Sequence, residues 1–243
     1  DRIEVTGAQC FDQWFDRQPE RGREAFLDRV GLPRHKPFLL YVCSSLFRGT
    51  GSEARFVEKW IQAIRSSPDP ILRDVSILVR PHPQRMEEWA GAHLSNFKDI
   101  VLYGSHPIDD ESKNDYFDSM YHSVAAVGIN TSAQIEAGII DRPVFTIRSA
   151  ENAGTTEGTL HFHYLLDAGG GLVHQAESFL AHTGHLARAL DQRAEDATKL
   201  RSFVEVFVRP HGLATAATPL LVDAIEALGR QPKPAPQKPP MTV

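Results

Sequence analysis

The chain has 243 residues, of which 42% are hydrophobic and 23% are charged, and its formal net charge is −5. These values fit a globular protein with one large domain, or one and a half smaller ones, and the negative charge argues against nucleic-acid binding. No apolar run reaches the roughly 20 residues that a membrane-spanning helix needs, and no signal-peptide pattern begins the sequence. The two cysteines, Cys10 and Cys43, form no CxxC pair, so we expect neither a disulfide framework nor a zinc site, and we expect a soluble, cytoplasmic protein.

The first 36 residues look like the end of a preceding unit. Residues 2–7 resemble the last part of a strand, and a short amphipathic piece follows at 11–15. A domain that begins at its own last strand suggests that something upstream is missing, and a short N-terminal edge strand is the alternative. Residues 20–30 then have a helical pattern that ends at Gly31. We therefore assign residues 1–36 to the end of an N-terminal domain or to a linker.

Apolar runs alternate with helical patterns from residue 38 to residue 174. The runs lack polar alternation, which is typical of strands covered on both faces of a parallel sheet. The sequence predicts strands at 38–43, 75–79, 100–103, 124–128, 143–147 and 172–173, and helices at 53–65, 84–94, 113–122, 177–190, 194–207 and 215–228. This order predicts a doubly wound, mostly parallel α/β sheet over residues 37–229, with helices on both faces. Residues 230–243 are proline-rich and we expect them to be disordered.

The stretch from Val124 to Ile147 reads as strand, small polar turn, short helix and second strand. In α/β proteins this arrangement presents backbone N–H groups and a positive helix end to a phosphate, so Asn130, Thr131 and Ser132 are candidate ligands of a phosphate group. Glu136 follows Ser132 by about one helical turn and could reach a ribose or sugar hydroxyl beside that phosphate. The alternative is an ordinary strand–helix–strand unit in which Thr and Ser cap the helix.

Polar residues also follow the other predicted strands. Ligands of open α/β sheets bind beyond the carboxyl ends of the strands, where Arg80 and His82 lie within the sequence RPHP. The alternative for this segment is a rigid loop with a surface histidine. Ser44 and Ser45 occupy the turn after the first strand. Neither the GxGxxG dinucleotide fingerprint nor the P-loop pattern GxxxxGK[ST] is present.

Three further histidines are candidates for a site. His211, within the sequence RPHG, precedes the final predicted helix, and small residues near Thr215 would let a ligand approach that helix closely. His161 and His163 alternate along a segment that we expect to be extended, at residues 160–165. No third ligand accompanies them at a suitable spacing, so we do not expect a metal site.

The order of these motifs resembles the C-terminal, donor-binding half of a GT-B glycosyltransferase. The motifs are the serine-rich turn, RPHP, GINTSAQIEAG with a trailing RPV, and a late RPHG. The resemblance covers roughly residues 3–228 and is nearest to the capsule-type transferases of bacterial surface polysaccharides and to CDP-glycerol glycerophosphotransferase-like proteins. It implies a Rossmann-like domain, half of a GT-B fold, that binds a nucleotide-activated donor.

The resemblance also implies roles for the candidate residues. The donor site would comprise Ser44, Ser45, Arg80, His82, Asn130, Thr131, Ser132 and Glu136. His211 and Thr215 would also belong to it, although their match to the family's motifs is weaker. The resemblance implies no metal and no cofactor. The substrates that it implies are a UDP- or CDP-linked donor, which is a nucleotide sugar or a CDP-polyol, and a glycan or lipid-linked acceptor. It is compatible with peripheral membrane association and with a partner domain or chain. The catalytic base of such enzymes usually comes from the N-terminal domain, so no catalytic residue is assigned.

Two other functions fit the same residues. A sugar-nucleotide 2-epimerase shares the architecture, although its chemistry needs further carboxylates in the cleft. A nucleotide-sugar-binding or scaffold module without catalytic activity is the other alternative.

Overall fold

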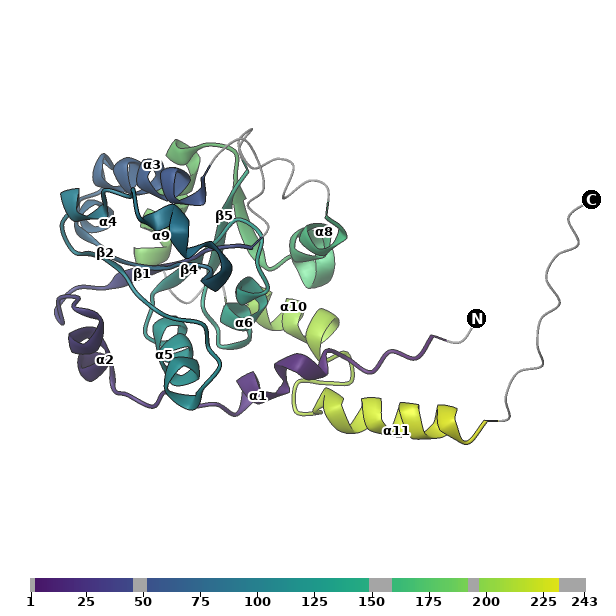
Figure 1. The fold of residues 1–243 in the computed structure, drawn as a ribbon. Coiled ribbons are helices and arrows are strands. Elements are labelled where there is room, and N and C mark those ends of the chain that lie inside the picture. Colours follow the sequence, from purple (N-terminus) through teal and green to yellow (C-terminus); the bar gives the residue numbers. More distant parts are fainter. Residues whose placement is uncertain (1–2, 46–51, 149–158, 192–196, 232–243) are drawn as a thin grey trace, which may run out of the picture.

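The computed structural model of the chain describes residues 3–45, 52–148, 159–191 and 197–231. These residues form a six-stranded sheet with helices on both faces (Figure 1). Neighbouring strands all run parallel, in the order β3-β2-β1-β4-β5-β6. The strands are β1 (Phe38–Val42), β2 (Ser76–Arg80), β3 (Ile100–Leu102), β4 (Ala125–Val127), β5 (Val144–Ile147) and β6 (Val173–Ala176). This architecture confirms the predicted Rossmann-like α/β fold.

The α-helices lie before, between and after these strands. They are α1 (Asp12–Phe15), α2 (Arg23–Val30), α3 (Glu53–Arg65), α4 (Pro70–Asp74), α5 (Asp110–Tyr121), α6 (Ala133–Ile139), α8 (Leu160–Asp167), α9 (Phe179–Asp191), α10 (Ala197–Phe203) and α11 (Ala217–Gly229). Short 3₁₀ segments are η1 (Gln9–Phe11), η2 (Pro83–Trp89), η3 (Leu94–Asn96) and η4 (Ala168–Gly170), and the π-helical segment η5 (Val204–Val208) continues α10. None of the described helices is long and apolar enough to cross a membrane.

The strand order reverses beside β1. The chain moves outwards from β1 to β2 and β3, then returns to place β4 on the other side of β1. In open α/β sheets, ligands bind at such a reversal, in the crevice beyond the carboxyl ends of the central strands. Residues that follow β1, β2 and β4 are therefore the first candidates for a functional site.

Both faces of the sheet are buried, which explains the continuous apolar runs in the sequence. Leu40 and Val42 belong to the core beneath α2, α5, α6, α8 and α10, whereas Leu39 and Tyr41 belong to the core beneath α3, α4 and α9 (Figure 1). Successive side chains of a strand point to opposite faces, so a strand between two helical layers has no polar side. All five residues of β1 are buried accordingly.

Three of the predicted elements have another conformation. Residues 3–7 form no strand, and the nearest backbone bond runs from the N–H of Ala8 to the carbonyl of Val208, at 2.9 Å. Val208 ends a π-helical segment, and a helix end offers no strand edge to pair with. Residues 160–165 lie in helix α8, where the hydroxyl of Thr159 accepts the N–H of Phe162 as an N-terminal cap. The prediction of an extended segment here was therefore wrong.

The predicted helix at residues 84–94 is replaced by short 3₁₀ segments. The segment η2 contains a non-helical residue, Arg85, with φ −135° and ψ 31°. The side chain of Glu88 reaches back to the start of α3, where it accepts the hydroxyl of Ser52 and the N–H of Glu53. This contact caps α3 with a carboxylate from another segment.

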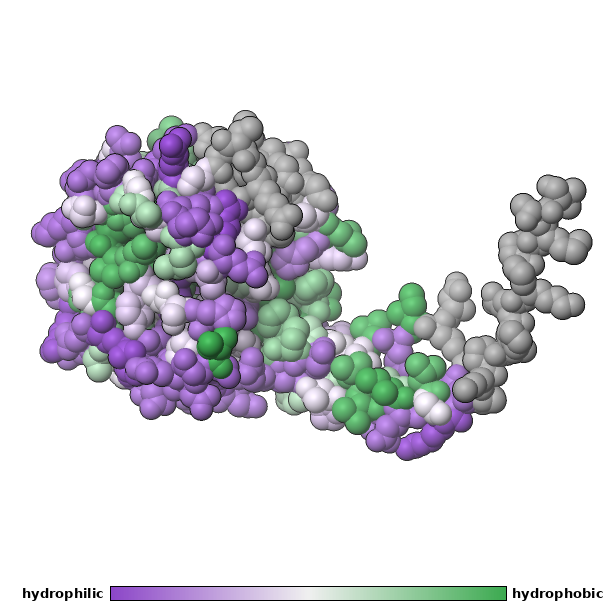
Figure 2. Space-filling view, viewed as in Figure 1, coloured by the Kyte–Doolittle hydropathy of each residue, from purple (hydrophilic) through white to green (hydrophobic). Residues whose placement is uncertain are grey.

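The N-terminal residues pack tightly on the α/β core. Trp14, Phe26, Leu27 and Val30 are buried in the same apolar cluster as α5 and α6. The assignment of residues 1–36 to the end of a preceding domain remains a prediction, as does the disorder expected from residue 230, which falls mostly outside the described residues. Exposed apolar side chains gather on α11, which extends away from the sheet (Figure 2); they include Val222, Ile225 and Leu228.

Candidate functional site

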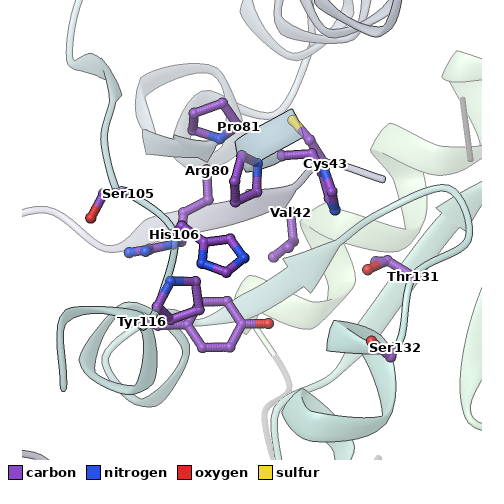
Figure 3. A pocket seen from close by; sticks show the side chains of 12 residues that line it. Val42, Cys43, Arg80, Pro81, Ser105, His106, Tyr116, Thr131 and Ser132 are labelled. Atoms are coloured by element: carbon purple, nitrogen blue, oxygen red, sulfur yellow. The ribbon is translucent and has the colours of Figure 1, made fainter. Parts of the chain in front are cut away.

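A cavity of about 220 Å³ opens at the carboxyl ends of β1, β2 and β4, where the strand order reverses. It is lined by Val42, Cys43, Arg80, Pro81, His82, Pro83, Ser105, His106, Pro107, Tyr116, Thr131 and Ser132. Figure 3 shows Arg80, His106 and Tyr116 on one side of this cavity, with Thr131 and Ser132 facing them from the other. The described lining contains an arginine, two histidines and four hydroxyl groups but no carboxylate, although the whole chain is acidic. The cavity therefore suits an anion.

Arg80 is the last residue of β2 and is only 4% exposed. Its guanidinium stacks over the ring of Tyr116, with Cζ 5.1 Å from the ring centroid, and Nη1 donates to the carbonyl oxygen of Asp115 at 3.2 Å. Gly104 packs against it so closely that a Cβ there would lie 2.5 Å from Cζ, and its φ of +117° also requires glycine. Burial lowers the pKa of Arg80, yet an arginine keeps its charge in proteins.

The charge of Arg80 has no ion-pair partner in the part of the chain that the structure describes. No carboxylate oxygen of the described residues lies within 4.0 Å of its nitrogens, although neighbouring arginines form several such pairs. A buried charge without a counter-ion costs several kcal/mol, about 3–5 where one partner of a buried pair has been removed. The carboxylate of Asp115 acts favourably on Arg80, but it forms its ion pairs with Arg21 and Arg29. Because Arg80 also lines the cavity, an anion in that cavity would supply a direct counter-charge.

His82 follows Arg80 in the extended RPHP segment. Its Nδ1 accepts the N–H of Gln84 at 3.3 Å, which favours the neutral ring with its proton on Nε2. Burial, together with the positive charge of Arg85 and the ring of His106, lowers the pKa of His82. At neutral pH it is therefore suited to donate a hydrogen bond from Nε2 rather than to carry a charge.

The turn after β4 places Thr131 and Ser132 in the cavity, and their predicted contact with a phosphate stays a prediction. Its backbone is less open than expected, because the N–H of Thr131 donates to Oε1 of Gln134 at 3.2 Å and that of Ala133 to the hydroxyl of Thr131 at 3.4 Å. The turn therefore presents mainly hydroxyl groups to the cavity.

Ser44 and Asn130 do not line the cavity. Both are buried, and the hydroxyl of Ser44 donates to the carbonyl oxygen of Asn130 at 2.7 Å. The side-chain amide of Asn130 donates in turn to the hydroxyl of Thr159. These bonds tie the loops after β1 and β4 to the start of α8. The half-buried Ser45 is also absent from the lining.

Glu53 also fixes the loop after β1, through hydrogen bonds of its own. Its carboxylate is 2% exposed and accepts the N–H of Ser44 at 3.0 and 3.2 Å and the hydroxyl of Tyr41 at 3.3 Å. Burial raises the pKa of Glu53 to about 8, although both hydrogen bonds act to lower it. The sequence reading missed Glu53 because its partners lie nine and twelve residues away, beyond the reach of a helical pattern.

Glu136 reaches the cavity only through Tyr116. Its Oε2 accepts the hydroxyl of Tyr116 at 2.6 Å, and Tyr116 lines the cavity whereas Glu136 does not. Burial raises the pKa of Glu136 to about 7, and the bond from Tyr116 acts against this. The predicted contact between Glu136 and a ribose stays a prediction.

His211 and Thr215 lie away from the cavity. Nε2 of His211 is 2.6 Å from the carbonyl oxygen of Val5, and neither residue is part of the lining. The start of α11 is already capped, because the N–H groups of Ala217 and Thr218 donate to the carboxylate of Asp12 at 3.0 and 2.7 Å. The structure therefore leaves no open helix end here for a ligand, contrary to the expectation from the sequence.

The sequence reading missed the loop between β3 and α5, which contributes Ser105 and His106, and the α5 residue Tyr116. A signal for this loop was present. His106 precedes Pro107 directly after a predicted strand, as His82 precedes Pro83 after β2. Among the described residues, no group of three His, Cys, Asp or Glu side chains could hold a metal ion.

No protein-family model matches this sequence, and no curated protein matches it. Solved structures match its fold. WaaG, a glycosyltransferase involved in lipopolysaccharide biosynthesis, has a TM-score of 0.54 and 18% identity, over 90% of this chain and 54% of its own. The wall teichoic acid polymerase TagF has a TM-score of 0.52 and 18% sequence identity, over 84% of this chain and 47% of its own. A protein from Listeria monocytogenes, provisionally assigned as a UDP-N-acetylglucosamine 2-epimerase, has a TM-score of 0.50 and 16% sequence identity, over 95% of this chain and 55% of its own.

The chain thus spans about half the length of the solved structures that it matches. At these identities the likeness shows the fold. The chain has a Rossmann-like α/β fold, which matches about half of each of these proteins.

Proposed function

We propose that the cavity beyond β1, β2 and β4 binds the diphosphate of a nucleotide-activated donor. The donor is a UDP- or CDP-linked sugar, or a CDP-linked polyol. The domain is the donor-binding half of a GT-B-type glycosyltransferase that acts in the cytoplasm, in the synthesis of a surface polysaccharide such as a capsule. It transfers the sugar, or the polyol phosphate, to a hydroxyl group of a glycan or lipid-linked acceptor without a metal ion.

The buried charge of Arg80, which forms no ion pair with any described residue, carries this proposal. Its guanidinium is buried, lines the cavity and has no carboxylate within 4.0 Å among the described residues. Guanidinium groups bind phosphate oxygens with strong, charge-assisted hydrogen bonds. Two matched solved structures, the glycosyltransferase WaaG and the polymerase TagF, support the choice of reaction class.

In the proposed reaction with a sugar donor, the acceptor hydroxyl attacks the anomeric carbon and gives its proton to the catalytic base. The bond from that carbon to the diphosphate oxygen breaks, and the nucleoside diphosphate leaves with the bonding electrons. With a CDP-linked polyol, the hydroxyl instead attacks the phosphorus that carries the polyol, the bond from that phosphorus to the bridging oxygen breaks, and CMP leaves. Arg80 and the hydroxyl of Ser132 stabilise the charge that develops on the leaving group. A fixed cation in a site shielded from water can do this without a metal.

The acceptor site and the catalytic base belong, in this proposal, to a second domain or partner chain. The exposed apolar side chains of Val222, Ile225 and Leu228 on α11 support such a contact, because monomeric proteins rarely expose contiguous apolar patches. Membrane association of the acceptor would bring the domain to a membrane surface only peripherally.

Calorimetry of donor binding tests the proposal. The probes are UDP-glucose, CDP-glycerol, GDP-mannose, ADP-glucose and dTDP-glucose. At about 100 times its dissociation constant, a bound probe raises the free energy of unfolding by about 2.7 kcal/mol, so a thermal-shift screen finds it first. Replacing Arg80 by Gln should then weaken its binding by about tenfold to a hundredfold, since charged hydrogen bonds contribute about 1.5–3 kcal/mol.

Arg73→Gln is the matched control, because Arg73 donates to a backbone carbonyl far from the cavity. It should leave the affinity unchanged. Circular dichroism confirms that Arg80→Gln stays folded, and Ser132→Ala gives a second, milder variant of the same cavity. Unchanged affinity in both cavity variants would refute the assignment, and the lack of any response to all five probes would refute donor binding.

A sugar-nucleotide 2-epimerase is the second candidate, favoured by the likeness to the Listeria monocytogenes protein. Both functions require the diphosphate site, so binding alone does not separate them. Incubation with UDP-N-acetylglucosamine and analysis of the sugar by NMR does: epimerisation changes the C2 stereocentre without an acceptor, whereas transfer requires one. If the protein binds the donor but catalyses neither epimerisation nor transfer, even in the presence of a partner chain, it is a nucleotide-sugar-binding module without catalytic activity.

A further inference from the structure

Asp115 gives Arg80 its backbone carbonyl but not its carboxylate. It lies on α5 directly before Tyr116, and its carbonyl oxygen accepts Nη1 of Arg80 at 3.2 Å. Burial acts to raise the pKa of Asp115, but hydrogen bonds from Arg29 and Tyr103 outweigh it and lower the pKa, so the group is charged at neutral pH. Buried charges of opposite sign usually pair. Within the described part of the chain, the carboxylate of Asp115 and the guanidinium of Arg80 do not.

Three side chains hold the carboxylate of Asp115 instead. Arg29 donates from Nε to Oδ1 at 2.9 Å and from Nη2 to Oδ2 at 3.0 Å, in the two-pronged contact that arginine makes with a carboxylate. Arg21 donates from Nη1 to Oδ1 at 3.0 Å, and the hydroxyl of Tyr103 donates to Oδ2 at 2.6 Å. Both carboxylate oxygens are therefore bonded, and their position is fixed.

Four other carboxyl groups surround this region. Each accepts a hydrogen bond elsewhere, and none has an oxygen within 4.0 Å of a nitrogen of Arg80; they are Asp109, Glu111, Asp118 and Glu136. Of the five carboxyl groups, Asp115 acts most strongly on the charge of Arg80. Arg21 and Arg29 both pair with Asp115, so its negative charge is balanced on the side away from the cavity.

We propose that Arg21 and Arg29 are positioning residues of the anion site, which keep the carboxylate of Asp115 from neutralising Arg80. This inference rests on the proposed binding of a diphosphate in the cavity. Without the two arginines, the negative charge of Asp115 would attract the guanidinium of Arg80 and compete with the bound anion for it.

Both arginines belong to the segment that precedes β1. Arg21 lies just before α2 and Arg29 in its last turn, whereas Asp115 lies on α5 beside the cavity. The same segment contacts α5 through Arg17, whose Nη2 donates to Oδ1 of Asn114 at 2.8 Å. The affinity of the cavity therefore depends on how this segment packs on α5, although none of its described residues lines the cavity.

Calorimetry with the double variant Arg21→Gln/Arg29→Gln tests the proposal. The probes are inorganic pyrophosphate, in magnesium-free buffer, and the five nucleotide-linked donors named above. We expect the double variant to bind them about threefold to thirtyfold more weakly than the wild type, since an unbalanced negative charge near the site opposes an anion. Arg34→Gln is the matched control in the same segment and should leave the affinity unchanged, because Arg34 pairs with Asp28 at the surface.

A third substitution separates an effect of charge from damage to the fold. Asp115→Asn removes the negative charge but keeps the backbone carbonyl that Arg80 contacts. Added to the double variant, it should restore the affinity to within about threefold of the wild type, without restoring the thermal stability that the lost ion pairs provided. Circular dichroism shows which variants fold. If the double variant does not, Arg29→Gln with and without Asp115→Asn provides the same comparison.

The outcomes separate this inference from the proposed function. Binding of neither pyrophosphate nor any donor overturns both. Binding of pyrophosphate alone overturns the donor function only, and the variants are then compared with pyrophosphate. Unchanged affinity in the double variant, an equal loss in Arg34→Gln, or a loss that Asp115→Asn does not restore overturns only the role of Arg21 and Arg29. A loss that Asp115→Asn restores supports that role.

Discussion

The carboxylate of Asp12 lies 3.0 Å from the guanidinium of Arg209, a residue 197 positions further along the chain. The same carboxylate accepts the N–H groups of Ala217 and Thr218 and the hydroxyl of Thr218. Asp12 therefore joins the N-terminal segment, the loop before α11 and the start of α11 itself.

Replacing Asp12 by Ala should lower the free energy of unfolding by about 2–4 kcal/mol. The helix loses its cap, worth about 0.5–2 kcal/mol, and Arg209, which is 6% exposed, loses its counter-charge. Urea denaturation measures the change. Asp16→Ala, at an exposed site one turn away, is the control and should alter stability by no more than about 0.5 kcal/mol.

The contribution of Asp12 also depends on pH. Desolvation acts to raise the pKa of Asp12, but hydrogen bonds from Thr218, Ala217 and Arg209 outweigh it and hold the pKa at about 2. A depressed pKa gives stability that is present above the unfolded value, near 4, and is lost as the pH falls through 2. The difference between wild type and Asp12→Ala should therefore shrink between pH 4 and pH 2; a constant difference would contradict the assignment.

Gly104→Ala tests whether the packed position of the Arg80 guanidinium matters. The added Cβ would lie 2.5 Å from Cζ of Arg80 at a φ of +117°, so both the contact and the backbone resist it. We expect a loss of about 1–3 kcal/mol in stability and weaker binding of the donor probes. Gly91→Ala is the control, because nothing lies within 4 Å of a Cβ there and its backbone conformation is unexceptional. Equal affinities in the two variants would show that the position of Arg80 does not matter for binding.

Much of the fold could be predicted because local and long-range signals agree. The run from Phe38 to Val42 is apolar throughout, and it forms the central strand β1, buried on both faces. Gly31 ends α2 in the left-handed conformation that glycine adopts readily, with φ 79°. The predictions failed where a distant partner decides the conformation, as at residues 84–94, whose Glu88 side chain caps α3.

The site could be predicted only in part. Arg80, His82, Thr131 and Ser132 meet in one cavity because the carboxyl ends of parallel strands share an edge of the sheet. Which side chains turn into that cavity depends on tertiary packing, so the pattern could not show that Asn130 turns inwards. Nor could it show that a residue 205 positions away occupies the start of α11.

Glu53 should make stability depend on pH between about pH 4.5 and pH 8. Burial raises its pKa to about 8, so between the unfolded value near 4.5 and pH 8 the folded state holds a proton that the unfolded state lacks. Stability therefore falls as the pH rises across this window. Glu53→Gln removes the effect and should gain on the order of 2 kcal/mol relative to wild type between pH 5.5 and pH 8. Urea denaturation across that range measures the gain, and Glu87→Gln, at an exposed position, should show none.

His182 should give the opposite slope at acid pH. It is fully buried on the face of the sheet opposite α5, where its Nε2 accepts the indole N–H of Trp60 at 2.9 Å. Burial, with a smaller effect from His185, lowers the pKa of His182 to about 3, so the folded state keeps the ring neutral. The unfolded state gains a proton below about pH 6.5, and stability is lost as the pH falls from 6.5 towards 3.

His182→Gln keeps an acceptor for Trp60 but cannot take up a proton. Its stability should therefore depend less on pH than that of the wild type, by on the order of 2–3 kcal/mol between pH 6.5 and pH 4. Trp60 provides the readout, because its fluorescence changes when it leaves the core. His35→Gln, at an exposed site, should follow the wild-type curve. Because His182 does not line the cavity, donor affinity at pH 7 should be unchanged. Parallel stability curves for wild type and His182→Gln would show that His182 titrates alike in the folded and unfolded states, and would contradict the lowered pKa.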